Sequence, residues 1–184
     1  TPDSFSDGGL HATTDAAIAH ARKLISEGAQ ILDIGGESTR PGSQAVAVAE
    51  ELNRVLPVVE ALRNDGLALS VDTCKPEVMR ACLDAGADMI NDVTGFGNPQ
   101  SREVVARHAS CAVCVMHMQG EPRTMQVAPH YDDVVAEVRA ELLSRAAALE
   151  NSGVAHRRIL IDPGFGFGKT PAQNYALLRN LDRK

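Results

Sequence analysis

The sequence predicts a parallel (β/α)₈ TIM barrel, and three observations support this α/β fold class. Short apolar segments alternate with helical segments along the 184 residues, which is the order of parallel strands joined by crossover helices. The apolar segments show no internal polar alternation, as expected when both faces of a sheet are covered. Residues Gly28 to Asp33 are also echoed by Gly86 to Asn91, and this repetition favours a barrel over a doubly wound open sheet.

The expected elements follow one another in strict alternation. Helices are expected at 15–27, 44–63, 76–85, 100–108, 133–151 and 171–180. Strands are expected at 31–34, 67–72, 89–91, 111–117 and 159–162. A closed barrel has eight strands. We therefore expect residues 1–184 to form a single barrel domain that is truncated at both termini and contains about strands 2–6 plus the first βα loop.

Local chemistry marks the ends of these elements. Gly28 and Gly86 follow the first and third helices, where glycine readily takes the left-handed conformation of a helix end. Pro76 and Pro171 begin helices, because the first turn does not need their missing N–H. Pro57 lies inside the second helix and is expected to kink or divide it.

Composition points to an ordinary globular domain that handles small molecules. The chain is 44% hydrophobic and 23% charged, and its net charge of −6 argues against affinity for nucleic acid or an anionic membrane. No apolar run approaches the ~20 residues of a membrane span, and no signal peptide is visible at Thr1. The Cys111 and Cys114 spacing has no second pair to complete a zinc site. We expect a cytoplasmic protein with reduced thiols.

The loop over 33–42 has the chemistry of a phosphate-binding site. It follows a short apolar strand, contains two glycines, and leaves through Pro41 and a further glycine. Thr39 can donate a hydroxyl hydrogen bond, and Arg40 can form a bidentate pair with a phosphate or diphosphate. The alternative is an ordinary solvated turn with an exposed arginine.

Three polar residues end different predicted strands. Asp72, Asn91 and Asp162 would meet at one edge of a parallel barrel, the edge at which such barrels build their active sites. Two carboxylates and an amide suit a flat heterocycle that is rich in N–H donors and has one carbonyl. Each residue by itself has helix capping as an alternative role.

The glycine-rich segment 162–170 resembles a nucleotide-binding loop only superficially. Its Gly168-Lys169-Thr170 ending needs a glycine five residues earlier, and Pro163 stands there instead, so we reject nucleotide hydrolysis. His117 can act as an acid or base. No carboxylate partner for His117 is identifiable in the sequence, and a structural histidine at a strand end is favoured.

Together these motifs resemble the dihydropteroate synthases, folate-pathway enzymes that are inhibited by sulfonamides. The matching segments occur in the family's order, at 1–9, 33–42, 70–73, 90–93, 116–120 and 162–169. The resemblance implies a transferase in a (β/α)₈ barrel. It would join p-aminobenzoate to 6-hydroxymethyl-7,8-dihydropterin diphosphate, releasing diphosphate and 7,8-dihydropteroate, with Mg²⁺ as cofactor.

The resemblance also assigns roles to residues. It implies that the pterin ring is held by Asp72, Asn91 and Asp162, in a pocket lined by Met116 and Phe167.

For the other groups, the resemblance implies that Thr39 and Arg40 hold the diphosphate and that Phe5 and Pro41 frame p-aminobenzoate. Asp7 would lie near the reacting methylene, so Asp7 and Arg40 are the expected catalytic residues.

Other parts of the family pattern lie beyond this sequence. An asparagine that binds magnesium would precede Thr1, so no metal ligand is expected within this chain. A lysine segment and an Arg-x-His motif would follow Lys184. We therefore expect residues 1–184 alone to be weakly active or inactive, and a homodimer is plausible for the full-length protein.

Two alternatives to this function remain at the level of sequence. A pterin-binding domain of a methyltetrahydrofolate corrinoid methyltransferase would share the Asp-Asn-Asp residues but would not need the Thr39 and Arg40 diphosphate site. A non-catalytic pterin-binding remnant would keep the barrel without the chemistry.

Overall fold

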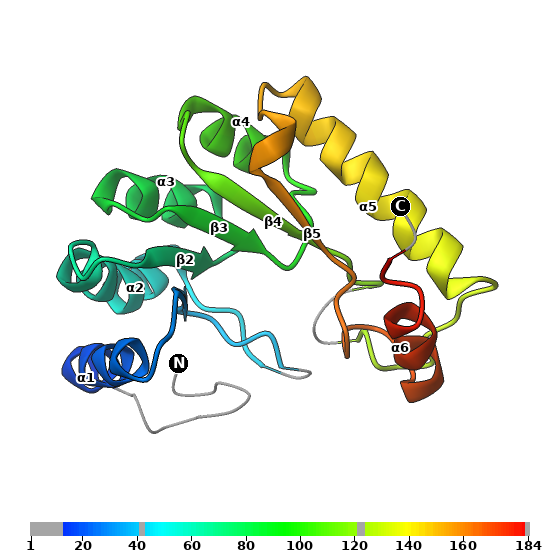
Figure 1. Ribbon diagram of the computed structural model, residues 1–184, viewed down its shortest axis with the longest axis horizontal. Helices are drawn as coiled ribbons and strands as arrows, with labels where there is room; N and C mark the ends of the chain where they lie inside the picture. Colours follow the sequence, from blue (N-terminus) through cyan, green and yellow to red (C-terminus); the bar gives the residue numbers. More distant parts are fainter. Residues whose placement is uncertain (1–12, 41–42, 121–123, 183–184) are drawn as a thin grey trace.

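The computed structural model describes residues 13–40, 43–120 and 124–182. Its five strands, β1 (Ile31–Gly35), β2 (Ala68–Asp72), β3 (Met89–Asp92), β4 (Ala112–Met116) and β5 (Ile159–Asp162), form one parallel sheet. Their order in space is their order in sequence (Figure 1). A doubly wound sheet reverses direction at a switch point, whereas a barrel does not. The strand order therefore agrees with the barrel prediction.

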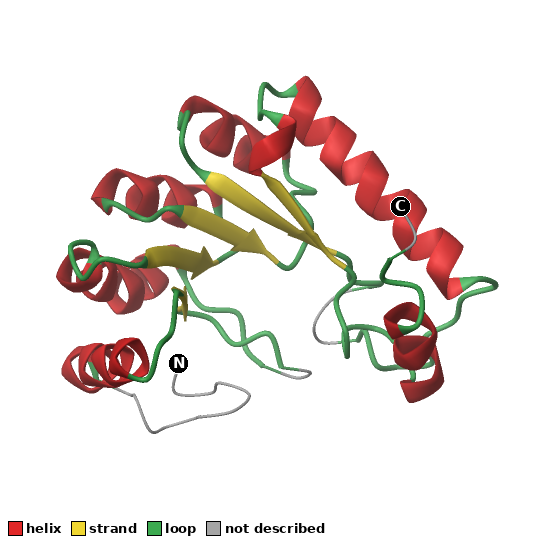
Figure 2. Ribbon diagram, in the orientation of Figure 1, coloured by secondary structure: helices red, strands yellow, loops and turns green. Residues whose placement is uncertain are grey.

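The helices alternate with the strands as predicted. They are α1 (Thr14–Ser26), α2 (Val48–Leu62), α3 (Pro76–Ala85), α4 (Pro99–Arg107), α5 (Val134–Asn151) and α6 (Pro171–Leu178), with a short 3₁₀ turn η1 (His156–Arg158) before β5. Helices α1 to α5 lie along the outer side of the curved sheet (Figure 2). The largest difference from prediction is at α2, which begins four residues later than expected, and η1 was not predicted.

The hydrophobic core lies between the sheet and its helices. Alternate strand residues such as Leu69, Val71 and Ile90 point outward into this core, where they meet Val59 and Leu62 of α2. Each such side chain contributes about 1.5–3 kcal/mol when fully buried. The remaining strand positions therefore point to the inner face, because side chains alternate along a strand.

Strand register places polar residues on that inner face. Gly35 of β1 is paired with Asp72 of β2, which is paired with Asn91 of β3. Asn91 is paired in turn with Cys114 of β4. Two residues beyond Cys114, Met116 of β4 is paired with Asp162 of β5. Asp72 and Asn91 therefore lie in one register row, and Asp162 lies two residues further toward the carboxyl edge of the sheet.

The sequence echo corresponds to a structural repeat. Gly28 and Gly86 both have positive φ, at 101° and 114°, and both follow a helix. The polar residues that end the two echoed segments, Asp33 and Asn91, lie on the inner face, where Asn91 Nδ2 donates to Asp33 Oδ2 at 3.3 Å. The repeat thus directs two matching polar side chains toward each other.

Pro57 does not divide α2, which continues from Val48 to Leu62 as a single helix. The proline removes one backbone hydrogen bond. The buried side chains of Val55, Val59 and Leu62 keep the helix packed against the sheet and offset that loss. Among the described helices, none is both long and apolar enough to cross a membrane.

Candidate functional site

The inner-face carboxylates converge around Cys114. Burial raises the pKa of the Cys114 thiol to about 11, and the nearby charges of Asp162, Asp33 and Asp72 add to the rise. Carboxylates from β1, β2 and β5 therefore lie close enough to the Cys114 thiol of β4 to affect its ionisation. The structure thus brings the predicted trio of Asp72, Asn91 and Asp162 to one region, and it adds Asp33, to which the sequence analysis gave no binding role.

Asp72 is the most perturbed carboxyl of the site. Burial raises its pKa to about 8, and repulsion from the carboxylates of Asp33, Asp92, Glu51 and Glu37 contributes further. Near neutral pH the group therefore keeps its proton in the free protein. A ligand that presents N–H donors to Asp72 would stabilise its ionised form, because hydrogen bonds to a carboxylate favour the charge.

The loop after β5 is pressed against the end of β4. His117 N donates to Asp162 O at 2.9 Å, and Gly164 N donates to Asp162 Oδ1 at 2.8 Å. Gly164 has a φ of +66°, and a Cβ there would lie 2.0 Å from His117 O. Only glycine fits this approach. Met116 is buried and is paired with Asp162 in the sheet, and Phe167 is half-buried in the loop that follows Asp162.

Lys169 stabilises this loop through hydrogen bonds. This role was not predicted from the sequence. Its Nζ donates to Phe167 O at 2.8 Å, Gly164 O at 2.9 Å and His117 O at 3.3 Å. The side chain is buried, and burial lowers its pKa to about 8. In the sequence, Lys169 looks like part of a failed phosphate loop. Its three carbonyl partners show that it stabilises the chain between β5 and α6.

His117 does have a carboxylate partner, which corrects the expectation from sequence. Its Nε2 lies 3.3 Å from Glu141 Oε2, and its ring is 6.1 Å from that of Tyr131. Burial lowers the pKa of His117, and the charge of Lys169 lowers it further, whereas Glu141 opposes the change. Glu141 lies in the middle of α5, so no local motif links it to His117.

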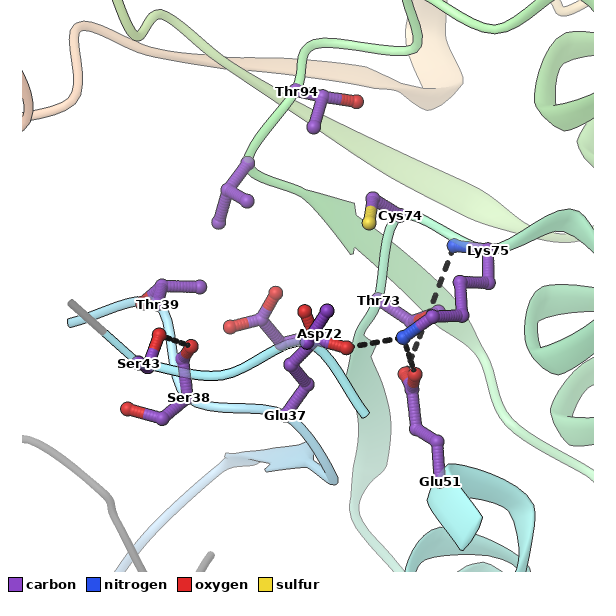
Figure 3. Close-up of a pocket in the computed structure, with 12 residues that line it drawn as sticks. Glu37, Ser38, Thr39, Ser43, Glu51, Asp72, Thr73, Cys74, Lys75 and Thr94 are labelled. Carbon is purple, nitrogen blue, oxygen red and sulfur yellow. Dashed lines mark hydrogen bonds and ion pairs between the residues drawn. The ribbon is translucent and has the colours of Figure 1, made fainter. Parts of the chain in front are cut away.

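A cavity of about 290 Å³ opens beside Asp72. Thr39, one of the predicted diphosphate ligands, lines it together with Glu37, Glu51 and Lys75, and these side chains surround Asp72 (Figure 3). The last three were not predicted from the sequence, because two glutamates and a lysine on separate elements carry no spacing signal.

The Thr39 loop is ordered by short polar contacts. Ser43 Oγ donates to Ser38 O at 2.6 Å and to Arg40 O at 2.9 Å, and Arg40 N donates to Ser38 Oγ at 3.3 Å. Arg40 is half-buried directly after Thr39. Of the two predicted diphosphate ligands, Thr39 therefore lines the cavity, and Arg40 is its neighbour in the chain.

Three predicted site residues, Phe5, Asp7 and Pro41, lie outside the described residues. Within 13–40, 43–120 and 124–182, no three His, Cys, Asp or Glu side chains are grouped as metal ligands. All four cysteines are free thiols.

Known proteins resemble this chain closely. The dihydropteroate synthase of Escherichia coli (strain K12) is 51% identical over 182 residues, which cover 98% of this chain and 64% of that protein. A Yersinia pestis dihydropteroate synthase, solved as a sulfonamide drug complex, matches 98% of this chain with a TM-score of 0.94 and 47% identity, and the match covers 66% of that structure. The Burkholderia cenocepacia enzyme complexed with 7,8-dihydropteroate matches 92% of this chain with a TM-score of 0.86 and 55% identity, covering 61% of that structure.

The chain thus spans about 64% of the length of the Escherichia coli relative. The resemblance to dihydropteroate synthases that the motifs predicted is confirmed, and so is the barrel-type fold. The family described as pterin binding enzyme matches residues 1–184. By this match over its full length, the chain belongs to the pterin binding enzyme family.

Proposed function

We propose that this chain is part of a dihydropteroate synthase. The enzyme would condense 6-hydroxymethyl-7,8-dihydropterin diphosphate with p-aminobenzoate to give 7,8-dihydropteroate and diphosphate. The observation that carries the proposal is the convergence of Asp72, Asn91 and Asp162 on one inner face of a parallel sheet. A pterin ring offers several N–H donors and one carbonyl, and this set of acceptors and one amide is complementary to it.

The inner-face acids also suit the reaction. When the C–O bond to diphosphate breaks, positive charge develops on the methylene carbon and spreads into the electron-rich pterin ring. The carboxylates of Asp33, Asp72 and Asp162 stabilise that charge. The amine of p-aminobenzoate then forms the new C–N bond and gives up a proton. No covalent enzyme intermediate is required, so the site needs no activated nucleophile.

The remaining groups are assigned by position. Thr39, which lines the cavity, and the adjacent Arg40 would hold the diphosphate. Met116 and Phe167 would contact the pterin. Phe5, Pro41 and Asp7 stay predictions for the p-aminobenzoate site and the reacting methylene. The choice of p-aminobenzoate as a substrate, though not of the residues that hold it, is supported by a Xanthomonas albilineans relative, 56% identical, which was solved with 4-aminobenzoic acid.

Magnesium, subunit organisation and compartment also remain proposals. The described residues do not offer a ready set of metal ligands, so Mg²⁺ would depend on oxygen atoms of the bound diphosphate. When bound, it would neutralise the charge of the leaving group. A cytoplasmic location is compatible with four free thiols. Inhibition by sulfonamides is supported by the Yersinia pestis relative, which was solved as a sulfonamide drug complex. A homodimer of the full-length protein stays a prediction.

The test is a turnover assay with both substrates. The full-length protein that contains residues 1–184 is incubated with the dihydropterin diphosphate and p-aminobenzoate, and both dihydropteroate and diphosphate are measured. We expect equal amounts of the two products, and we expect D72N and D162N to lose at least about 100-fold in rate because an amide cannot replace a carboxylate facing N–H donors. The matched control is D182N, which alters an exposed carboxyl.

Other outcomes would contradict the proposal. Binding of methyltetrahydrofolate without release of diphosphate would favour a corrinoid methyltransferase domain. Tight pterin binding without turnover would favour a non-catalytic protein.

A further inference from the structure

Lys75 lies at the centre of a charged cluster that joins three elements. It precedes α3, and its Nζ forms ion pairs with Glu37, from the loop after β1, and with Glu51 of α2 (Figure 3). Glu51 is 1% exposed and also accepts a hydrogen bond of 2.6 Å from Thr73 Oγ1. A buried carboxylate needs a cation and hydrogen bonds of this kind. Glu51 therefore provides a fixed anchor for Lys75.

The other end of the cluster is the loop that carries Thr39. Glu37 stands two residues before Thr39, and its Oε2 accepts both from Lys75 and from Val46 N, the latter at 3.1 Å. Glu37 thus connects the two ends of the loop between β1 and α2, and Lys75 ties that connection to the buried anchor. The position of Thr39 at the cavity depends on this chain of contacts.

The backbone at the base of the loop is also fixed against α2. Arg54 Nη1 donates to Gly36 O at 2.9 Å, and a Cβ on Gly36 would lie 2.8 Å from Glu51 Cγ. The backbone at Gly36 is therefore packed directly against α2, with no room for a side chain between them. Ser43 orders the segment after Glu37 internally, and Lys75 ties that segment, through Glu37, to the buried Glu51.

We propose that Lys75 is a positioning residue for the diphosphate site, acting through Glu37 to hold Thr39 at the cavity rather than by touching the diphosphate itself. The inference rests on the proposed function and adds a residue to it. Two carboxylates already occupy the Lys75 ammonium group, so little of its charge is available to a ligand. The described cavity is otherwise acidic, because Glu37, Glu51 and Asp72 all line it.

The two possible roles of Lys75 make opposite predictions for E37A. If Lys75 positions the loop, removing Glu37 releases the Thr39 segment and weakens binding of a diphosphate. If Lys75 binds the diphosphate directly, removing Glu37 takes away a negative charge, frees the ammonium group and tightens binding. Since Glu51 keeps its cation in E37A, this variant is expected to fold.

The experiment measures, for the full-length protein that contains residues 1–184, dissociation constants for 6-hydroxymethyl-7,8-dihydropterin diphosphate and for the same pterin without diphosphate. We expect E37A and K75M to weaken binding of the diphosphate ligand about tenfold, and to change binding of the plain pterin by less than about twofold. The double variant should bind the diphosphate ligand no more weakly than the single variant with the larger loss of affinity, because both changes break one chain of contacts. K75R should bind nearly as wild type.

The control is K23M, which alters an exposed lysine that is also paired with a glutamate, Glu27. If K75M does not fold, as judged by circular dichroism, E37A decides the question alone. Unchanged or tighter diphosphate binding by E37A overturns the inference, and so does an equal loss for both ligands. A wild-type protein that binds neither ligand contradicts the proposed function instead, and the two failures are thereby distinguished.

Discussion

Replacing Asp72 by asparagine is expected to make the protein more stable at alkaline pH. The unfolded chain ionises this carboxyl near its ordinary pKa of 3.8, whereas the folded protein keeps the proton until about pH 8. Between these values the unfolded state binds fewer protons, so wild-type stability falls as pH rises from about 4 to 8. Asparagine has no charge to desolvate and escapes this loss.

The size of the effect follows from the shift in pKa. Each pKa unit corresponds to about 1.4 kcal/mol, so the full displacement sets an upper limit of about 6 kcal/mol. Asp72 also lines an open cavity, and water there screens part of the penalty. We therefore expect D72N to gain about 1–3 kcal/mol in unfolding free energy at pH 8 and almost nothing at pH 4.

Urea unfolding followed by circular dichroism at pH 4 and pH 8 measures this difference directly. D182N, which changes an exposed carboxyl, should show no pH-dependent gain. A D72N protein that is less stable than wild type by the same amount at both pH values would refute the reasoning. The same variant should lose pterin affinity, so the position would exchange stability for function.

Three further changes test the loop after β5 and the core. G164A places a methyl group 2.0 Å from His117 O at a positive φ. We expect this variant to lose at least about 2 kcal/mol of unfolding free energy, measured in urea, and to bind pterin more weakly. Stability equal to that of the wild type would contradict the close approach of Gly164 to His117. K169M removes three hydrogen bonds to carbonyls and should cost about 2 kcal/mol. Because the pKa of Lys169 in the folded protein is lowered to about 8, the unfolding free energy of the wild type should rise between about pH 8 and 10.5. If K169M still shows this rise, Lys169 does not cause it. L62A empties a fully buried position and should cost about 2–5 kcal/mol in urea unfolding, while L143A, at a 48% exposed leucine, should cost under 1 kcal/mol; equal losses would contradict the location of the core.

The sequence by itself determined the fold class and the positions of most elements. Strands and helices depend on local patterns of apolar residues, and helix ends depend on residues such as Gly28 and Pro76, whose preferences act within a few positions. Asp72, Asn91 and Asp162 were predictable as a group for the same reason. Each directly follows an apolar run near the end of a strand, and parallel strands bring such ends to one edge.

Only the tertiary structure decided which distant groups meet and which are buried. Asn91 finds Asp33 from 58 positions away, and Lys75 finds Glu37 from 38 positions away. Lys169 is 52 positions from His117 and is turned inward to carbonyls, although the sequence around it resembles a phosphate-binding loop. Neither an ion pair nor a desolvated ammonium leaves a periodic trace in a sequence, because both arise when packing brings separate elements together and removes water.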